Sequence, residues 1–270
     1  MNAAASRVVP PVGAVRAPLL ETSQLRVIVA GRVLVDSLSI AVEPGTCWAI
    51  VGRNGAGKTS LLRTLAGLVV PASGDIRYAD RPLAHLGARE RARHRSVLPQ
   101  DTYDAFPASA LQAVLVGRHP HLARFAWENG DDIARARDAL RTFGIEALES
   151  RDVRTLSGGE RRRVALAALL VQDAPLALLD EPSSHLDVVQ QAAALATFLD
   201  LARTGSRAVV MVLHDLHLAT RFCDHVIAIG GGNATAGPAS ALLDEPALSA
   251  LFGWPLVELT GAGLRTFVPR

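Results

Sequence analysis

The chain contains a single lysine, and its neighbours are residue types that bind phosphate groups. Lys58 lies in the segment Gly52-Arg53-Asn54-Gly55-Ala56-Gly57-Lys58-Thr59, followed by Ser60, and the segment fits the pattern G-x-x-x-x-G-K-[ST] at every fixed position. The ammonium group can lie between two phosphate oxygens, where a planar guanidinium is too bulky. Glycines let backbone N–H groups turn toward the phosphates. The segment therefore predicts a loop that binds the phosphates of a nucleotide.

The sequence on either side of this loop has the pattern that a phosphate loop needs. Residues 47–51 form a short apolar run typical of a buried strand, and residues 60–67 read as a helix closed by a glycine. A helix N-terminus adds partial positive charge beside bound phosphates. Thr59, next to the lysine, can present its hydroxyl to Mg²⁺.

A second group of candidate residues follows an apolar strand much later in the chain. Residues 176–179 are apolar and are followed by Asp180 and Glu181. Because side chains alternate along a strand, these two carboxylates point in different directions. Asp180 can hold Mg²⁺ through water, and Glu181 can polarise an attacking water as a general base. Such a pair can also simply cap a following helix, and the catalytic interpretation depends on the phosphate loop.

The elements that must position these residues alternate between strand and helix. Strands are predicted at 75–78, 96–98, 176–179, 207–213 and 225–229, and turns at 71–74 and 230–233. Between residues 100 and 156 no clear strand is found, but helical patterns cover 110–116 and 131–143. The pattern predicts an α/β fold with a mostly parallel sheet and a helical insertion over about 101–156. We expect an N-terminal extension without fixed structure at 1–20, a main domain at 21–252 and a C-terminal appendage at 253–270.

Composition limits the class of protein. The 270 residues are 49% hydrophobic, enough for one large α/β domain, and the net charge is only +2. Pro10 and Pro11 interrupt the apolar N-terminal run, and no later run is long enough to span a bilayer, so we expect a cytoplasmic chain. Cys47 and Cys223 match no metal or redox spacing and are expected to be reduced, buried thiols.

The segment Leu156-Ser157-Gly158-Gly159-Glu160 resembles the signature motif of the ABC ATPases. Gln100 resembles the Q-loop glutamine of that family, residues 184–187 its D-loop, and His214 its switch histidine. The resemblance covers residues 25–252. It implies a P-loop ATPase core with a mostly parallel sheet, an antiparallel β portion and an inserted helical subdomain.

The resemblance also implies roles for individual residues. ATP and Mg²⁺ are the expected cofactors, with residues 52–60 binding the nucleotide. Three residues are expected to hold the metal, namely Thr59, Gln100 and Asp180. Catalysis is assigned to Glu181, His214 and Gln100. Ser157, Gly158 and Gly159 are expected to form a second anion cradle at a helix start, which closes over the γ-phosphate held by a second copy in a head-to-tail dimer.

A finer resemblance is to the ATPase subunits of importers for iron-siderophores, haem and vitamin B12. It rests on residues 98–100, Ala105-Phe106-Pro107, residues 117–121 and residues 214–219. It implies a peripheral protein on the cytoplasmic face of the inner membrane, docked on a permease dimer that receives a chelate from a periplasmic binding protein. In that branch the segment after the Q-loop forms a groove that receives a short permease helix, so we expect substitutions of Phe106 or Arg118 in this segment to uncouple transport from hydrolysis.

The same residues also allow nucleic-acid binding, metal binding or another kind of ABC ATPase, and the sequence favours none of these. The arginine runs at 89–95 and 161–163 could contact nucleic acid, but only 4% of residues are aromatic, and solvated helix faces are the simpler interpretation, so no nucleic-acid partner is expected. His214 and His217 lack a third metal ligand. A soluble ABC ATPase acting on DNA or ribosomes would carry a long coiled coil or a second domain, and a catalytically inactive module would be expected to lose Glu181 or His214.

One feature departs from the family pattern. Many ABC ATPases stack an upstream aromatic side chain on adenine, but no Phe, Tyr, Trp or His precedes Trp48. The corresponding position is near Val29, where only apolar side chains and Arg32 are available. We therefore expect weaker selection of the base than in relatives.

Overall fold

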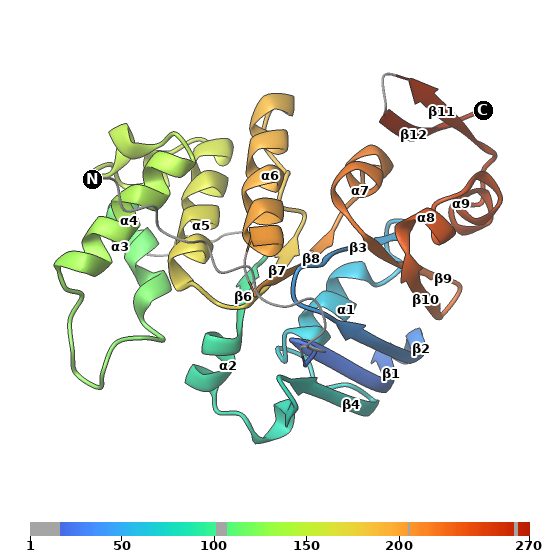
Figure 1. The fold of residues 1–270 in the computed structure, drawn as a ribbon, viewed down its shortest axis with the longest axis horizontal. Coiled ribbons are helices and arrows are strands. Elements are labelled where there is room, and N and C mark those ends of the chain that lie inside the picture. The colour runs from blue at the N-terminus through green and yellow to red at the C-terminus, as the bar shows by residue number, and fades with distance from the viewer. Residues whose placement is uncertain (1–16, 101–106, 205, 262–263) are drawn as a thin grey trace, which may run out of the picture.

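The computed structural model describes residues 17–100, 107–204, 206–261 and 264–270. Its largest sheet has the strand order β10-β9-β3-β8-β7-β6 (Figure 1). Five strands are parallel, namely β3 (Cys47–Gly52), β6 (Arg95–Leu98), β7 (Leu176–Asp180), β8 (Ala208–Val212) and β9 (His225–Gly230). The edge strand β10 (Asn233–Pro238) is antiparallel to β9. The predicted α/β class with a mostly parallel sheet is confirmed.

A second, antiparallel sheet has the order β2-β1-β4-β5. Its strands are β1 (Leu20–Val29), β2 (Arg32–Val42), β4 (Ser73–Tyr78) and β5 (Arg81–Pro82). This sheet and the helix α1 (Lys58–Leu65) cover one face of the large sheet, and their apolar side chains share one core cluster with alternate residues of the parallel strands.

The opposite face of the large sheet is covered by helices. The helices α5 (Gly158–Gln172), α6 (Val188–Thr204) and α7 (Leu216–Phe222) contact its strands, and α3 (Ala110–Leu115) and α4 (Gly130–Thr142) pack on α5 and extend the same core. The remaining helices are α2 (Ala88–His94), α8 (Ala239–Leu242), α9 (Glu245–Phe252) and the short turns η1 (Leu83–His85), η2 (Val116–Arg118), η3 (Glu146–Leu148) and η4 (Val153–Thr155). In the part of the chain that is described, no helix has the length and apolar character needed to cross a bilayer.

The strand β3 shows why its sequence is continuously apolar. Cys47, Ala49 and Val51 belong to the core cluster beneath the helices, whereas Trp48 and Ile50 belong to the cluster beneath α1 and the antiparallel sheet. All six residues of the strand are buried. A central parallel strand covered on both faces needs apolar side chains at every position.

The predicted strands lie where the sequence placed them, with small differences at their ends. The predicted turn at 71–74 is wrong in part, because Ser73 and Gly74 belong to β4. Gly74 has φ +84°, and a Cβ there would lie 2.4 Å from the carbonyl oxygen of Gln24 in β1. The glycine therefore permits a close strand approach. The helix α1 begins at Lys58, two residues earlier than predicted.

The N-terminal part of the described chain enters a sheet at once, and the C-terminal part forms a separate hairpin. Residues 1–16 of the expected N-terminal extension lie outside the described residues, and Leu20 already begins β1 with its side chain fully buried. At the C-terminus, β11 (Leu256–Gly261) and β12 (Leu264–Pro269) form a hairpin. The hairpin is attached to α7, since Thr220 Oγ1 donates to the carbonyl of Arg265 at 2.7 Å and Phe267 is buried in the core.

The turn η2 packs tightly against α5. A Cβ on Gly117 would lie 2.2 Å from the backbone oxygen of Ala168, so only glycine fits there. Next to it, Arg118 pairs with Asp132 at 2.8 Å and donates to the carbonyl of Val171 at 3.1 Å. The side chain of Arg118 is only 14% exposed, so its main contacts in the structure are internal, and its predicted role in coupling to a permease stays a prediction. Phe106, the other expected groove residue, lies outside the described residues.

The Arg118–Asp132 pair generates a prediction about stability. Asp132→Asn should lower the free energy of unfolding by about 3 kcal/mol, because it leaves a mostly buried guanidinium without its counter-ion. Hydrogen bonding to Arg118 lowers the pKa of Asp132. The contribution of the carboxylate is thus present above the pKa of an unfolded aspartate and is lost as the pH falls through the lowered folded-state value. Denaturant unfolding at several pH values measures both effects.

The matched control is the exposed pair of Arg137 and Glu149, whose side chains are 53% and 39% exposed. Arg137→Gln should change the unfolding free energy by less than about 1 kcal/mol. Equal losses in the two variants, or a loss in Asp132→Asn that persists unchanged at acid pH, would contradict the assigned role of the pair.

Candidate nucleotide-binding and catalytic site

The phosphate loop connects β3 to α1 and is shaped by two glycines. Gly52 has φ +152°, and a Cβ there would lie 2.3 Å from the backbone oxygen of Ile229 in the neighbouring strand. Gly57 has φ +106°, and its Cβ would collide with the side chain of Leu34 at 2.9 Å. A side chain at either position would displace the loop. Lys58 is the first residue of α1, so the free N–H groups of the helix start belong to the loop.

The lysine is drawn back across the loop. Lys58 Nζ donates to the carbonyls of Gly52 at 2.9 Å and Arg53 at 3.1 Å, and the residue is only 6% exposed. Burial lowers the pKa of Lys58, while the negative charges of Glu181 and Asp180 raise it in opposition. The ammonium is therefore held among acceptors, within the pocket that the loop surrounds.

Two oxygen donors suited to a hard cation lie together at the inner end of the loop. Thr59 Oγ1 donates to Asp180 Oδ1 at 3.1 Å, and Asp180 is only 2% exposed at the end of β7. Burial raises the pKa of Asp180, and the hydrogen bond from Thr59 opposes the rise. Gln100 lines the same small pocket as Thr59 and Asp180. A hydroxyl, a carboxylate and an amide oxygen are ligands that suit Mg²⁺. Water and nucleotide phosphate normally complete the coordination shell of this ion.

No cluster of three or more His, Cys, Asp or Glu side chains that could hold a metal is found among the described residues. The two cysteines, Cys47 and Cys223, are both buried and free. Burial raises the pKa of Cys47 to about 12, so this thiol stays protonated.

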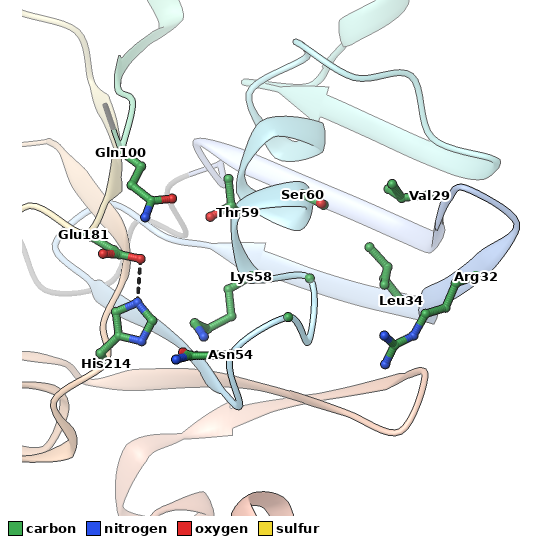
Figure 2. A pocket seen from close by; sticks show the side chains of 12 residues that line it. Val29, Arg32, Leu34, Asn54, Lys58, Thr59, Ser60, Gln100, Glu181 and His214 are labelled. Atoms are coloured by element: carbon green, nitrogen blue, oxygen red, sulfur yellow. Dashed lines mark hydrogen bonds and ion pairs between the residues drawn. The ribbon is translucent and has the colours of Figure 1, made fainter. Parts of the chain in front are cut away.

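The candidate general base lies at the same edge of the sheet. Glu181 follows Asp180 in the left-handed conformation, with φ +49°, and its Oε1 lies 2.5 Å from Nε2 of His214. His214 follows β8, the strand between β7 and β3. Figure 2 shows Glu181 and His214 facing each other, with Gln100 and Lys58 around the same space. The histidine can orient the carboxylate toward an attacking water.

These residues line one pocket of about 590 Å³. Its lining residues are Val29, Arg32, Leu34, Asn54, Gly55, Gly57, Lys58, Thr59, Ser60, Gln100, Glu181 and His214. The catalytic candidates lie at one end and the tip of the β1–β2 hairpin at the other (Figure 2). Leu34 was missed from the sequence, although its spacing from Arg32 on one strand face was a usable signal.

Some predicted loop residues are not part of this lining. Gly52, Arg53 and Ala56 contribute backbone to the loop but do not line the pocket, and Asp180 lies behind Thr59. These residues remain predicted contributors to nucleotide binding through the loop backbone and the metal.

The segment predicted to form the second cradle lies at the start of α5. Ser157 caps this helix, and a reciprocal capping box joins it to Glu160, with Ser157 N donating to Glu160 Oε2 at 2.7 Å. Backbone and side-chain hydrogen bonds from Ser157 lower the pKa of Glu160. A Cβ on Gly159 would lie 2.8 Å from the carbonyl oxygen of His185, so the 184–187 segment runs directly against the glycines.

The cradle does not belong to the pocket of its own chain. Ser157, Gly158 and Gly159 are absent from the residues that line the pocket around Lys58. The structure therefore brings the phosphate loop, Asp180, Glu181, His214 and Gln100 together and leaves the signature segment apart from them.

The sequence favours solvated helix faces for the arginine runs at 89–95 and 161–163, and for several of these arginines that prediction is wrong. Arg162 is only 2% exposed and donates to backbone carbonyls beside the catalytic residues. Arg91 and Arg95 also donate to backbone carbonyls, those of Leu86 and Ala66. Arginine repeats with polar neighbours resemble a surface in sequence, and only the packed structure reveals such internal hydrogen bonds.

Comparison with known proteins places these motifs in a family. The family model described as ABC transporter matches residues 35–184. A hemin import ATP-binding protein of Nocardia farcinica is 41% identical over 86% of this chain and 82% of its own length. A petrobactin import ATP-binding protein of Bacillus anthracis is 34% identical over 91% of this chain and 95% of its own length.

A cobalamin import ATP-binding protein of Halobacterium salinarum is 38% identical over 86% of this chain, and the match spans only 58% of that longer relative. Among solved structures, a chain of a protein described as a metal-chelate type ABC transporter, in an inward-facing conformation, is 26% identical with a TM-score of 0.79 and covers 94% of this chain and 98% of its own length. The family model covers more than half of the chain, and the loop, signature and acidic strand end carry its motifs in order, so the chain belongs to the ABC transporter family.

Proposed function

We propose that this chain hydrolyses ATP and thereby drives the import of a metal chelate through a membrane permease. The observation that carries the hydrolytic part is that Lys58, Thr59, Gln100, Glu181 and His214 line one pocket, with Asp180 hydrogen-bonded to Thr59 behind it. Lys58 and the loop N–H groups bind the phosphates, and Thr59, Asp180 and Gln100 hold Mg²⁺. A metal held by these residues would neutralise charge on the transferring phosphate. Glu181 accepts a proton from water, and His214 keeps its carboxylate aimed at that water.

The working unit of this proposal is a pair of copies. The Ser157 cradle has bare backbone N–H groups at a helix start and lies outside its own pocket. Pairing head to tail supplies each cradle with the γ-phosphate held by the other copy. The site is then complete only in the dimer.

The cargo and the membrane partner follow from the relatives. Three of them are named as import proteins for hemin, petrobactin and cobalamin. Iron-siderophore, haem or vitamin B12 is therefore the proposed class of cargo, delivered by a periplasmic binding protein to a permease dimer. This chain is the peripheral subunit on the cytoplasmic face of the membrane.

The permease contact is assigned to the helical insertion. Phe125 and Trp127 are 88% and 87% exposed, and they line a groove of about 530 Å³ with Arg89 and His119. Exposed aromatic side chains beside charged ones are typical of protein contacts. Because the insertion follows Gln100, a permease segment bound here is connected to the catalytic pocket.

The nucleobase of the bound nucleotide is assigned to the end of the pocket that the β1–β2 hairpin lines. Val29 is 42% exposed and Leu34 only 6% exposed, and the Arg32 side chain makes no hydrogen bond or ion pair with the other described residues. Without a ring to stack on, the base contributes little and the triphosphate dominates binding. Other nucleoside triphosphates are therefore accepted more readily than by relatives with an aromatic residue there.

The general base can be tested by Glu181→Gln, which keeps shape and hydrogen bonding but cannot accept a proton. ATP turnover should fall by about 100-fold or more, while Mg-ATP still binds and holds two copies together. Light scattering should show a dimer with Mg-ATP and a monomer with ADP. Lys58→Ala, the control, should lose nucleotide binding and the dimer together. A monomeric Glu181→Gln variant with parental turnover would remove both the assigned base and the shared site.

The base subsite can be tested by Val29→Tyr. A ring at the hairpin tip should add about 1 kcal/mol of stacking and lower KM for ATP about fivefold, with a smaller effect on CTP. Steady-state hydrolysis of ATP, GTP and CTP gives the comparison. Val70→Tyr places the same ring at a valine that is 89% exposed and outside the pocket, and it should change nothing. Strong preference of the parent for ATP over CTP would contradict the assignment.

The permease contact can be tested by the double change of Phe125→Ser and Trp127→Ser. ATP turnover by the isolated subunit should stay at the parental level, because neither residue lines the catalytic pocket. Uptake of hemin, an iron-siderophore and cobalamin by reconstituted vesicles should fall about tenfold, as loss of two aromatic anchors weakens an interface strongly. Trp254→Ser, which is 59% exposed in the C-terminal part, serves as control. Normal uptake by the double variant would exclude this groove.

A further inference from the structure

Arg162 joins two segments that carry catalytic side chains. It lies in the second turn of α5 and is only 2% exposed. Its Nη1 donates to the carbonyls of Pro99 at 2.7 Å and Gln100 at 3.2 Å. Its Nη2 donates to the carbonyls of Asp180 and Glu181 at 2.5 and 2.6 Å. One guanidinium therefore binds the backbone on both sides of the gap between Gln100 and Glu181.

The four carbonyls lie beyond the point where the pairing between β6 and β7 ends. The strands β6 and β7 pair in parallel as far as Leu98 and Leu179. The next residue on one side is Pro99, which has no N–H to continue the ladder. Arginine offers donors in one rigid plane and can satisfy several carbonyls that face each other. Its guanidinium thus holds the two strands together after their own hydrogen bonds have stopped.

The backbone at Glu181 needs such support. Glu181 is in the left-handed region at φ +49°, which is unfavourable for a residue with a Cβ. Conformations of this kind persist only where the surroundings determine them. The hydrogen bonds from Arg162 to the carbonyls of Asp180 and Glu181 restrain the peptides on each side of that residue.

The charge of Arg162 also reaches the metal site. Burial raises the pKa of Asp180, and the hydrogen bond from Thr59 and the positive charge of Arg162 are among the effects that oppose the rise. A buried cation beside Asp180 therefore favours the ionised carboxylate that a metal requires.

We propose that Arg162 is a positioning residue for ATP hydrolysis, which holds the Gln100 segment and the Glu181 backbone in the one arrangement that aims both side chains at the same nucleotide. The inference rests on the hydrolytic function proposed above. It assigns to an arginine of the signature helix a role in the active site of its own chain, in addition to the role of Ser157 toward a second copy.

The test compares Arg162→Lys and Arg162→Gln with the matched variant Arg163→Gln. Arg163 is the next residue of the same helix and also donates to two carbonyls, those of Phe143 and Gly144, but these lie in the helical insertion. All variants are made in the full chain, and their thermal unfolding, Kd for Mg-ATP and kcat are measured. Lysine keeps the buried charge, so Arg162→Lys remains informative if Arg162→Gln does not fold.

Arg162→Lys should lower kcat about 10- to 100-fold, because small misplacement of catalytic groups is costly. The Kd for Mg-ATP should change by less than about threefold, since Lys58 and the loop still bind the phosphates. Arg163→Gln should keep the parental kcat. Added guanidinium ion at millimolar concentration should partly restore kcat in Arg162→Ala and have no such effect on the parent or on Arg163→Ala.

Two results would overturn the inference. One is a parental kcat in Arg162→Lys and in any folded Arg162→Gln. The other is a fall in kcat that is matched by an equal rise in Kd and is reproduced by Arg163→Gln, which would indicate a structural role alone. If the parent itself hydrolyses no ATP, the proposed function falls. If the parent hydrolyses ATP and Glu181→Gln does not, that function stands whatever the Arg162 variants do.

Discussion

The constraint on which the site depends is the parallel order of the central strands. The neighbouring strands β3, β8 and β7 all end at the same edge of the sheet, and candidate functional residues lie at the end of each. The phosphate loop follows β3, His214 comes shortly after β8, and Asp180 and Glu181 mark the end of β7. Ligand sites form at the carboxyl ends of parallel strands because the chain leaves the sheet there with its functional groups exposed. Burial on both faces keeps these strands in register.

The site also depends on balancing buried charge. Lys58, Asp180 and Arg162 are all nearly inaccessible to solvent. Each has several hydrogen-bond partners or opposite charges nearby, and a buried charge without them would be strongly destabilising. Lys58 bonds to loop carbonyls, and Thr59 donates to Asp180. The same contacts that make the charges tolerable also fix their positions, so stability and catalytic geometry rest on one network.

The helix α5 connects the signature segment at its start with the backbone beside Glu181. Its first residues are capped by Ser157, and Arg162 one turn later reaches the backbone beside Glu181. The helix itself packs in the core on one face of the central sheet. The turn η2 also contacts it so closely at Gly117 that a Cβ would not fit. A rigid helix that begins at the signature segment and reaches the backbone beside Glu181 is suited to keep these two places in a constant relation.

The sequence by itself determined the phosphate loop, the acidic strand end, the signature segment and most central strands. These features are local, because a glycine pattern, an apolar run or a helix cap depends on neighbours in the chain. The antiparallel hairpin of β1 and β2, whose pairing is interrupted by bulges, has a weaker alternation and was not located. The helix α6 is apolar around much of its circumference, so periodicity did not identify it.

Only the tertiary structure decided which polar side chains are internal. Arg118 and Arg162 look like surface residues in sequence, but one pairs with Asp132 and the other binds four backbone carbonyls. Their partners are 14 to 63 residues away along the chain. Hydrogen bonds across such separations depend on how helices and strands pack, which no local pattern records. Packing likewise decided that Leu34 lies against Gly57 beside the nucleotide pocket, because the two residues lie on different elements.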